Sequence, residues 1–96
     1  MYYFYVLYSL KDGKLYKGYS SNLGERFLRH QAGATRSTKH RRPLILIYTE
    51  NFDTKTDAMA RERWSKSLEG GTALIQLLIT KNILTEEKQL NIVKTQ

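Results

Sequence analysis

Residues 2–9, YYFYVLYS, carry apolar or aromatic side chains at almost every position. In an extended chain the odd-numbered residues of this run lie on one face and the even-numbered residues on the other, so both faces are apolar. This pattern predicts a central strand that is covered on both sides. The Asp12-Gly13 pair then predicts a tight turn. Residues 14–20, KLYKGYS, are the expected returning strand of this hairpin.

A short amphipathic helix is expected over residues 23–31. The preceding SSN segment is typical of helix N-caps, and Leu23 and Phe27 are spaced to share one helix face. The small and basic segment that follows, AGATRSTKHRRP, predicts a loop that ends at Pro43. Residues 44–52, LILIYTENF, then predict a buried third strand.

Two further helices are expected in the second half of the chain. The first begins at a cap formed by Asp53 or Thr54 and reaches about Ser67. The glycine pair at 70–71 is expected to break this helix, and the threonine that follows can cap a third helix through about Lys81.

The order of the predicted elements is β-β-α-β-α-α. This order predicts an α+β domain in which a small three-stranded antiparallel sheet is flanked by helices. A chain of 96 residues is long enough for one hydrophobic core and too short for two. We place the domain at residues 1–82 and expect residues 83–96 to form a C-terminal extension that is either frayed or helical.

Composition narrows the classes of function. The net charge is +7, which on a small domain favours polyanionic partners, chiefly nucleic acid. The chain has no cysteine, which excludes disulfides, zinc-thiolate sites and cysteine nucleophiles. Apolar segments such as ALIQLLI are far shorter than the roughly 20 residues that span a bilayer. Because no signal-peptide pattern precedes the first strand either, we expect a cytoplasmic protein without membrane contact.

Six of the 7 tyrosines lie within the first nineteen residues. Aromatic residues pack well in a hairpin, so this crowding alone does not indicate chemistry. It gains meaning from four short motifs, which are YFYVL at 3–7, YKG at 16–18, ERFLRH at 25–30 and AMARERW at 58–64.

In this order, with a hairpin between the first two, the four motifs resemble those of a GIY-YIG nuclease domain. The resemblance covers residues 2–75, and the STKHRRP loop at 37–43 is similar to that of small stand-alone, UPF0213-like members. Tyr3 and Phe4 stand where the first motif of the family has glycine and isoleucine. We find no counterpart to the asparagine that many members carry beyond the metal-binding glutamate.

The resemblance also implies which residues form the site. The residues that it places there are the catalytic Tyr5, Tyr16, Arg26 and His30, and Glu62 as the ligand of a divalent metal. A single carboxylate is enough for Mg²⁺ or Mn²⁺ if the ion keeps several waters and takes a substrate phosphate as well.

The proton acceptor for the attacking water is left open by the sequence. A phenol has a pKa near 10, so it acts as a base only where a cation favours the phenolate. Arg26 and the metal are candidates for that cation. We expect Tyr5 to be the base and Tyr16 to orient the nucleophile or the phosphate, but the two roles can be exchanged and the spacing does not decide between them.

Contacts to nucleic acid are expected mainly from the basic loop, where serine and threonine alternate with full charges. Such a composition suits phosphate contacts that position a strand without reading its bases. The in-strand glycine of the YKG motif allows close approach of a substrate. The residues expected to contact nucleic acid are Gly18, Tyr19, Arg36, Lys39, His40, Arg41 and Arg42.

Several of these residues have a structural alternative. Glu62 can pair with Lys66 one helical turn later. His30 can instead stabilise the C-terminal end of its own helix. Trp64 is expected in the core rather than stacked on a base.

These observations predict a metal-dependent endonuclease that cuts phosphodiester bonds in DNA, in repair or recombination, as a monomer or weak homodimer. RNA is an alternative substrate. The competing interpretation is a non-catalytic nucleic-acid-binding module that kept the fold, which the missing asparagine favours. The enzyme is favoured because four residues of the expected site are present together, namely Tyr5, Tyr16, Arg26 and Glu62.

Overall fold

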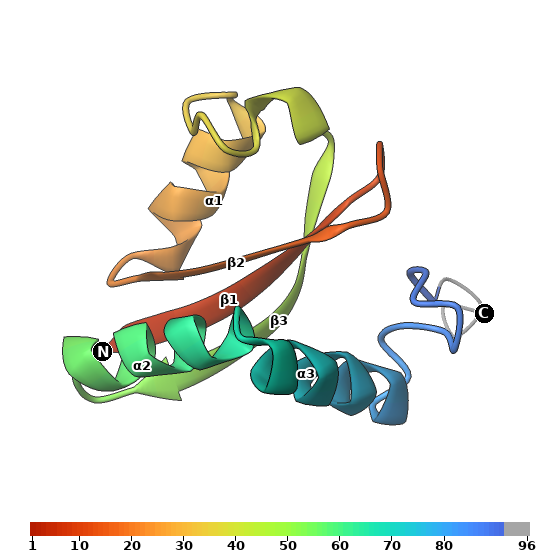
Figure 1. The fold of residues 1–96 in the computed structure, drawn as a ribbon. Helices are drawn as coiled ribbons and strands as arrows, with labels where there is room; N and C mark the ends of the chain where they lie inside the picture. Colours follow the sequence, from red (N-terminus) through yellow and green to blue (C-terminus); the bar gives the residue numbers. More distant parts are fainter. Residues whose placement is uncertain (92–96) are drawn as a thin grey trace.

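The computed structural model describes residues 1–91 and is built on three antiparallel strands in the order β2-β1-β3. These are β1 (Tyr2–Ser9), β2 (Leu15–Ser20) and β3 (Leu44–Phe52). Figure 1 shows the strongly twisted sheet with helices on both of its faces. The predicted α+β class, the β-β-α-β-α-α order and the central position of β1 are confirmed.

Burial of β1 follows the alternation in its sequence. The even-numbered side chains Phe4, Val6 and Tyr8 enter one hydrophobic cluster, which includes Leu74 and Leu78. The odd-numbered Tyr5 and Leu7 enter a second cluster on the opposite face, together with Leu44 and with the partly buried Leu23 and Phe27. The central strand therefore divides the interior into two cores, and Tyr5 belongs to the core beneath α1.

Helix α1 (Leu23–Gln31) has the predicted bounds. Its N-cap is Asn22, whose side-chain oxygen accepts a hydrogen bond from the backbone N–H of Glu25 at 3.1 Å. Strand β3 also has the predicted bounds, but it lies at the edge of the sheet and is only partly buried, with Thr49 and Asn51 exposed.

The predicted break at the glycine pair is wrong. Helix α2 runs over Lys55–Ser65, capped by Thr54, and α3 (Leu68–Thr80) starts immediately afterwards with Ser67 as its N-cap. The glycines lie inside the first turns of α3. None of the helices in residues 1–91 has the length and apolar character needed to cross a membrane.

Close packing between α2 and α3 explains the glycine at position 70. A Cβ added to Gly70 would lie 1.8 Å from the carbonyl oxygen of Trp64, so only glycine fits where the two helices meet. Trp64 itself packs against the core, as predicted, with the guanidinium of Arg61 4.0 Å from its ring. Arg61 also holds Glu50 of β3 through two hydrogen bonds of 2.7 and 2.9 Å.

The basic loop contains a short 3-10 helix, η1 (Lys39–Arg41). Arg41 pairs with Asp12 of the hairpin turn at 2.9 Å, and its backbone carbonyl accepts a hydrogen bond from the buried Ser9 hydroxyl at 2.6 Å. These contacts fix η1 against the end of the hairpin.

Residues 83–91 are not helical. Leu84 is buried in the core and forms an isolated β-bridge with Leu90. Tyr8, which belongs to the same core, donates a hydrogen bond to Gln89 at 3.2 Å. The proposed extension thus packs on the domain as far as residue 91, and the rest of it, residues 92–96, lies outside the described residues.

The contact at Gly70 gives a test of the helix junction. Gly70→Ala is expected to lower the free energy of unfolding by about 3 kcal/mol or more, because the added methyl group overlaps a backbone carbonyl that cannot move freely. Urea denaturation measures this change.

Gly24→Ala in α1 is the matched control. The nearest atom to an added Cβ there is 4.0 Å away, so this substitution is expected to stabilise the protein by up to about 1 kcal/mol. Equal effects of the two substitutions would contradict the close contact between α2 and α3.

Candidate active site

Three rings predicted to be catalytic meet on the α1 side of the sheet. The ring centroids of Tyr5 and Tyr16 are 6.3 Å apart, those of Tyr5 and His30 are 5.8 Å apart, and those of Tyr16 and His30 are 5.0 Å apart. The hairpin brings the two tyrosines together, since Tyr16 pairs with Leu7, two residues beyond Tyr5 on the same face of β1. Tyr5 and His30 are buried and Tyr16 is half-buried.

A buried chain of hydrogen bonds fixes His30. The Nε2 atom of its ring lies 2.9 Å from the Tyr5 hydroxyl, and its Nδ1 atom lies 2.7 Å from the hydroxyl of Thr38. Because a hydroxyl can donate or accept, Thr38 can satisfy either tautomer of the neutral imidazole. His30 therefore does more than stabilise the end of α1: it connects a strand, a helix and the basic loop.

Thr38 is the residue of this site that sequence reasoning missed. It is fully buried, although it lies in a polar loop that reads as exposed. Its partner is eight residues away along the chain and no periodic pattern joins the two. The one available signal is its position inside the STKHRRP segment, which the family resemblance singles out.

Gly18 makes room for Tyr5. The two residues are opposite each other on β2 and β1, and a Cβ on Gly18 would lie 2.6 Å from the Tyr5 hydroxyl. The space above this glycine is thus filled by the Tyr5 ring, and its role in the structure is to set the orientation of that ring.

The Arg26 guanidinium lies beside Tyr5 and affects its acidity. Burial, followed by the charge of Tyr16, raises the pKa of Tyr5 to about 12, while Arg26 acts in the opposite direction. The Nε atom of Arg26 is buried and has no hydrogen-bond partner among the described residues. A buried N–H donor without an acceptor is uncommon, so this atom marks a place where an acceptor from a ligand would be favourable.

His30 is neutral at physiological pH. Burial, and then the positive charge of Arg26, lower its pKa below the usual value of 6.5. The free protein therefore holds an uncharged imidazole against a protonated phenol.

Glu62 comes from α2, on the other side of the sheet from α1. Its carboxylate is close enough to contribute to the raised pKa of Tyr5, so the structure brings it within electrostatic range of that tyrosine. The carboxylate also accepts a hydrogen bond from Lys66 at 2.9 Å, which is the structural alternative expected from the sequence. Residues 1–91 contain no group of three or more histidine, cysteine, aspartate or glutamate side chains that could hold a metal.

Tyr19 does not join this group of rings. It pairs with Phe4, whose side chain belongs to the opposite core, so strand alternation places Tyr19 on that face as well. Lys17 shares this face, and its ammonium donates to the Ser65 carbonyl at 3.1 Å. Tyr19 is half-buried there, away from the face that carries Tyr5.

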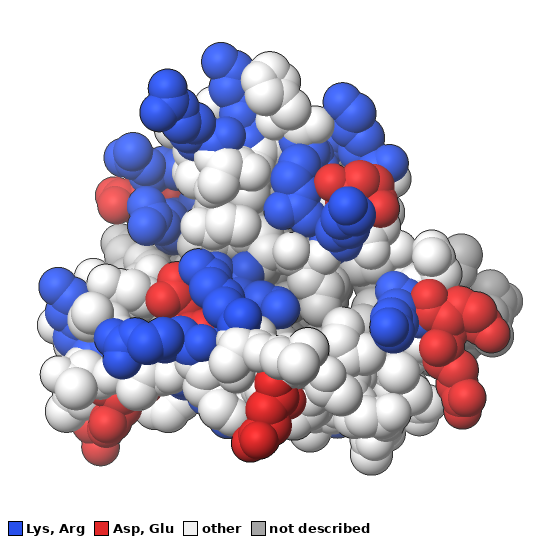
Figure 2. Space-filling view, viewed as in Figure 1, with Lys and Arg blue, Asp and Glu red and all other residues white. Residues whose placement is uncertain are grey.

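The predicted nucleic-acid contacts in the basic loop separate into two kinds. Arg41 has a structural role, since it pairs with Asp12 and donates to the Leu15 carbonyl at 3.3 Å. The others are exposed, namely Arg36, Lys39, His40 and Arg42. Figure 2 shows Lys and Arg crowded around α1 and the loop that follows it, and again along the near side of α2.

Comparison with known proteins finds a matching family model and similar chains. Residues 1–71 match the family model described as the GIY-YIG catalytic domain. A UPF0213 protein of Clostridium perfringens is 38% identical over 95 residues, which cover 96% of this chain and 100% of the relative. A UPF0213 protein of Staphylococcus saprophyticus is 44% identical over 61 residues, or 62% of this chain and 73% of the relative.

One solved structure has a similar fold. The solution NMR structure of the UPF0213 protein BH0048 from Bacillus halodurans matches with a TM-score of 0.50 and 33% sequence identity. The match covers 80% of this chain and 85% of that chain.

The hydrogen bond between Thr38 and His30 can be tested by its effect on stability. Thr38→Val is expected to lower the free energy of unfolding by about 1–3 kcal/mol, because it leaves a buried imidazole nitrogen unpaired. Thr38→Ser keeps the hydroxyl and should recover most of the loss. A Thr38→Val variant with the same free energy of unfolding as the wild type in chemical denaturation would contradict this hydrogen bond.

The raised pKa of Tyr5 predicts a dependence of stability on pH. Because the folded state holds the Tyr5 proton up to about pH 12 and the unfolded state releases it near 10, the stabilisation is complete below pH 10 and is lost as the pH rises from 10 to 12. The loss amounts to at most about 2.7 kcal/mol. Tyr5→Phe should therefore show a shallower decline in unfolding free energy above pH 10.

Tyr48 supplies the control for this titration. The pKa of Tyr48 is also raised to about 12, by burial and by Glu50, so part of the decline should persist in Tyr5→Phe and disappear only when Tyr48 is replaced as well. An unchanged slope in Tyr5→Phe would contradict a protonated, buried Tyr5.

Proposed function

Because this chain belongs to the GIY-YIG family of catalytic domains, we propose that it is a metal-dependent endonuclease that hydrolyses phosphodiester bonds in DNA. The family is nuclease-like, and the resemblance seen in the four sequence motifs is thereby confirmed. A net charge of +7 agrees with a nucleic-acid substrate.

One observation supports the proposal above the others: the two phenols and the imidazole converge beside a guanidinium whose buried Nε has no partner. A phosphodiester offers the anionic oxygens that this donor lacks, and a guanidinium is well suited to bind them. A bound phosphate would then lie next to the Tyr5 hydroxyl, since Arg26 and Tyr5 interact directly.

The reaction is the attack of water on the phosphorus atom. The water oxygen gives up a proton to a base and forms a bond to phosphorus, the bond from phosphorus to one sugar oxygen breaks, and the departing oxygen takes up a proton. Arg26 can stabilise the extra negative charge on the phosphoryl oxygens, which is the main requirement of this transition state.

In the free protein Tyr5 keeps its proton, so its expected role as the base requires additional positive charge at the site. Burial raises the pKa of Tyr5 to about 12 and lowers the pKa of His30 below its usual value, which disfavours transfer of the phenol proton to the imidazole. Tyr5 is therefore a hydrogen-bond donor until additional positive charge reaches the site. Once its proton is acidified, the Nε2 atom of His30 lies 2.9 Å away to receive it.

The residues present fit a divalent ion that keeps most of its waters. Glu62 would hold Mg²⁺ or Mn²⁺, with the substrate phosphate as a second ligand, because its carboxylate is partly buried and acts on Tyr5. When bound, such an ion supplies charge that polarises the phosphoryl oxygen and favours ionised water or phenolate.

A specific contact favours the competing function, a nucleic-acid-binding module without catalysis. The ion pair between Glu62 and Lys66 occupies the one carboxylate that would serve the metal. This pair is half exposed on the lysine side, and an exposed pair of this spacing contributes only about 0.3–0.5 kcal/mol. It is weak enough for a metal to displace, so we rank the enzyme first.

Plasmid nicking in the presence of Mg²⁺ tests the proposal. The wild-type protein is expected to nick supercoiled DNA, and Glu62→Gln and Tyr5→Phe are each expected to lower the rate by about 100-fold or more. Glu69→Gln is the control, since Glu69 is exposed on α3 and should change the rate less than twofold.

Binding measured on the same variants separates the two functions. Salt-sensitive binding without nicking by the wild-type protein, on single-stranded, duplex and branched DNA alike, would establish the binding module instead. Equal rates for Glu62→Gln and Glu69→Gln would exclude Glu62 as the metal ligand.

A further inference from the structure

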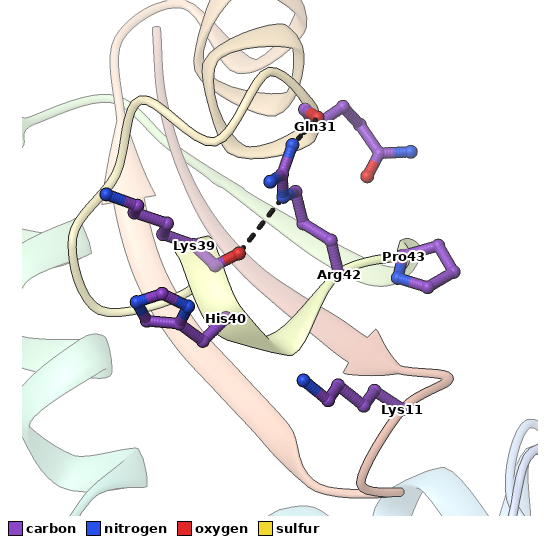
Figure 3. Close-up of a pocket in the computed structure, with 6 residues that line it drawn as sticks. All are labelled: Lys11, Gln31, Lys39, His40, Arg42 and Pro43. Atoms are coloured by element: carbon purple, nitrogen blue, oxygen red, sulfur yellow. Dashed lines mark hydrogen bonds between the residues drawn. The ribbon is translucent and has the colours of Figure 1, made fainter.

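A second, strongly basic hollow lies outside the group of rings. It is a cleft of about 530 Å³ between the β1–β2 turn, the C-terminal end of α1 and η1, shown in Figure 3. We call this hollow the turn cleft, and its lining residues are Lys11, Gln31, Lys39, His40, Arg42 and Pro43. The volume is typical of ligand pockets, and the lining contains three full positive charges and no carboxylate.

Arg42 is held in a fixed position at the turn cleft. Its Nε donates to the Lys39 carbonyl at 3.0 Å and one terminal nitrogen donates to the Gln31 carbonyl at 3.3 Å, as Figure 3 shows. Gly33, with a φ of +80°, allows this arrangement, because a Cβ there would lie 2.8 Å from the guanidinium carbon. The two bonds use two of five N–H donors, so the others remain for a ligand.

The lysines of the turn cleft are not neutralised by acidic side chains. Among residues 1–91, neither Lys11 nor Lys39 forms an ion pair, whereas the nearby Arg41 is paired with Asp12. Figure 3 shows Lys11 on the hairpin turn, across the cleft from η1. Like charges gathered in one hollow repel each other, and a polyanion relieves this repulsion.

The turn cleft and the ring site share their walls. Gln31 directly follows His30, and Lys39 directly follows Thr38, so the hydrogen bond between His30 and Thr38 holds both walls in place. Along β1, Tyr5 lies four residues before the end of the strand at Ser9. At about 3.3 Å per residue, these four residues span about 13 Å, and the hairpin turn that carries Lys11 follows Ser9, so the turn cleft lies beyond the ring site along β1.

We infer that the turn cleft binds the phosphate backbone of a nucleic-acid strand, several nucleotides beyond the phosphate at the ring site. The position of the second phosphate rests on the proposed function. The binding of backbone phosphate by the cleft does not require catalysis. The preferred substrate is then a strand that extends several nucleotides beyond the bond to be cut, and a dinucleotide is a poor one.

Fluorescence anisotropy with labelled single-stranded DNA, in EDTA so that no bond is cut, tests the cleft. The cleft variant is the double substitution Lys11→Gln with Lys39→Gln. The control is the double substitution Lys55→Gln with Lys81→Gln, which removes the same charge at exposed sites away from the turn cleft. Equal thermal unfolding midpoints for both would show that folding is unaffected.

The cleft variant is expected to bind a strand of about 12 nucleotides roughly 5–10-fold more weakly than the wild type at low salt. The slope of log K against log[salt] should fall by about 1.4, since each lost phosphate contact on a single strand contributes about 0.7. The control should change affinity less than twofold. In the wild type, affinity should rise between about 4 and 8 nucleotides, and this rise should be missing from the cleft variant.

The outcomes for the cleft and for the enzyme are separable. If the wild type nicks plasmid DNA but the cleft and control variants bind alike, the turn cleft is not a phosphate site and the proposed function stands. If the wild type never nicks DNA but the cleft variant alone loses affinity and salt slope, the cleft is a phosphate site and the protein is a binding module.

Discussion

The hydrogen bonds that join Tyr5, His30 and Thr38 are the interaction on which the rest of the molecule depends. Tyr5 lies on the one strand that is buried on both faces, so its hydroxyl has no access to water and must be satisfied from within. His30 provides the partner, and Thr38 in turn satisfies His30. Three segments that are distant in sequence thereby become one rigid unit, and any ligand that binds one of them meets the other two already in place.

This unit also explains why a small, highly basic protein keeps its interior neutral. Burial raises the pKa of Tyr5 and lowers that of His30, so both rings are uncharged at pH 7 although Arg26 lies beside them. Arg26 is the partly buried charge beside these rings, and exposed positive charges lie around them, among them Arg42, which is held by backbone carbonyls. The neutral interior costs little free energy to fold, and the exposed charges provide the attraction for a polyanion.

The sequence predicted most of this fold because the signals were local. An apolar run on both faces identified β1, and the SSN segment and the Asp53-Thr54 pair identified two helix starts, at which Asn22 and Thr54 are the caps. The glycine pair led to a wrong helix boundary. Gly70 is required by its close contact with the Trp64 carbonyl of another helix, and no local sequence rule describes a contact between helices. Thr38 was missed for the same reason: a buried threonine in a polar loop is recognisable only once its distant partner is known. The catalytic assignments came from motif order, and they stay predictions where the structure gives position but not activity.

Glu62 shows how charges on the surface and in the site depend on each other within the proposed function. In the free protein its carboxylate pairs with Lys66, whose ammonium is half exposed and can turn toward solvent. An arriving phosphate backbone offers Lys66 a stronger partner than a single carboxylate, and the same backbone brings a phosphate to Arg26. Release of Glu62 and delivery of the phosphate would then coincide, so both would become available as ligands for a divalent ion. Because linkage is reciprocal, metal and nucleic acid would each strengthen the binding of the other, and one carboxylate suffices where an isolated metal site would need several.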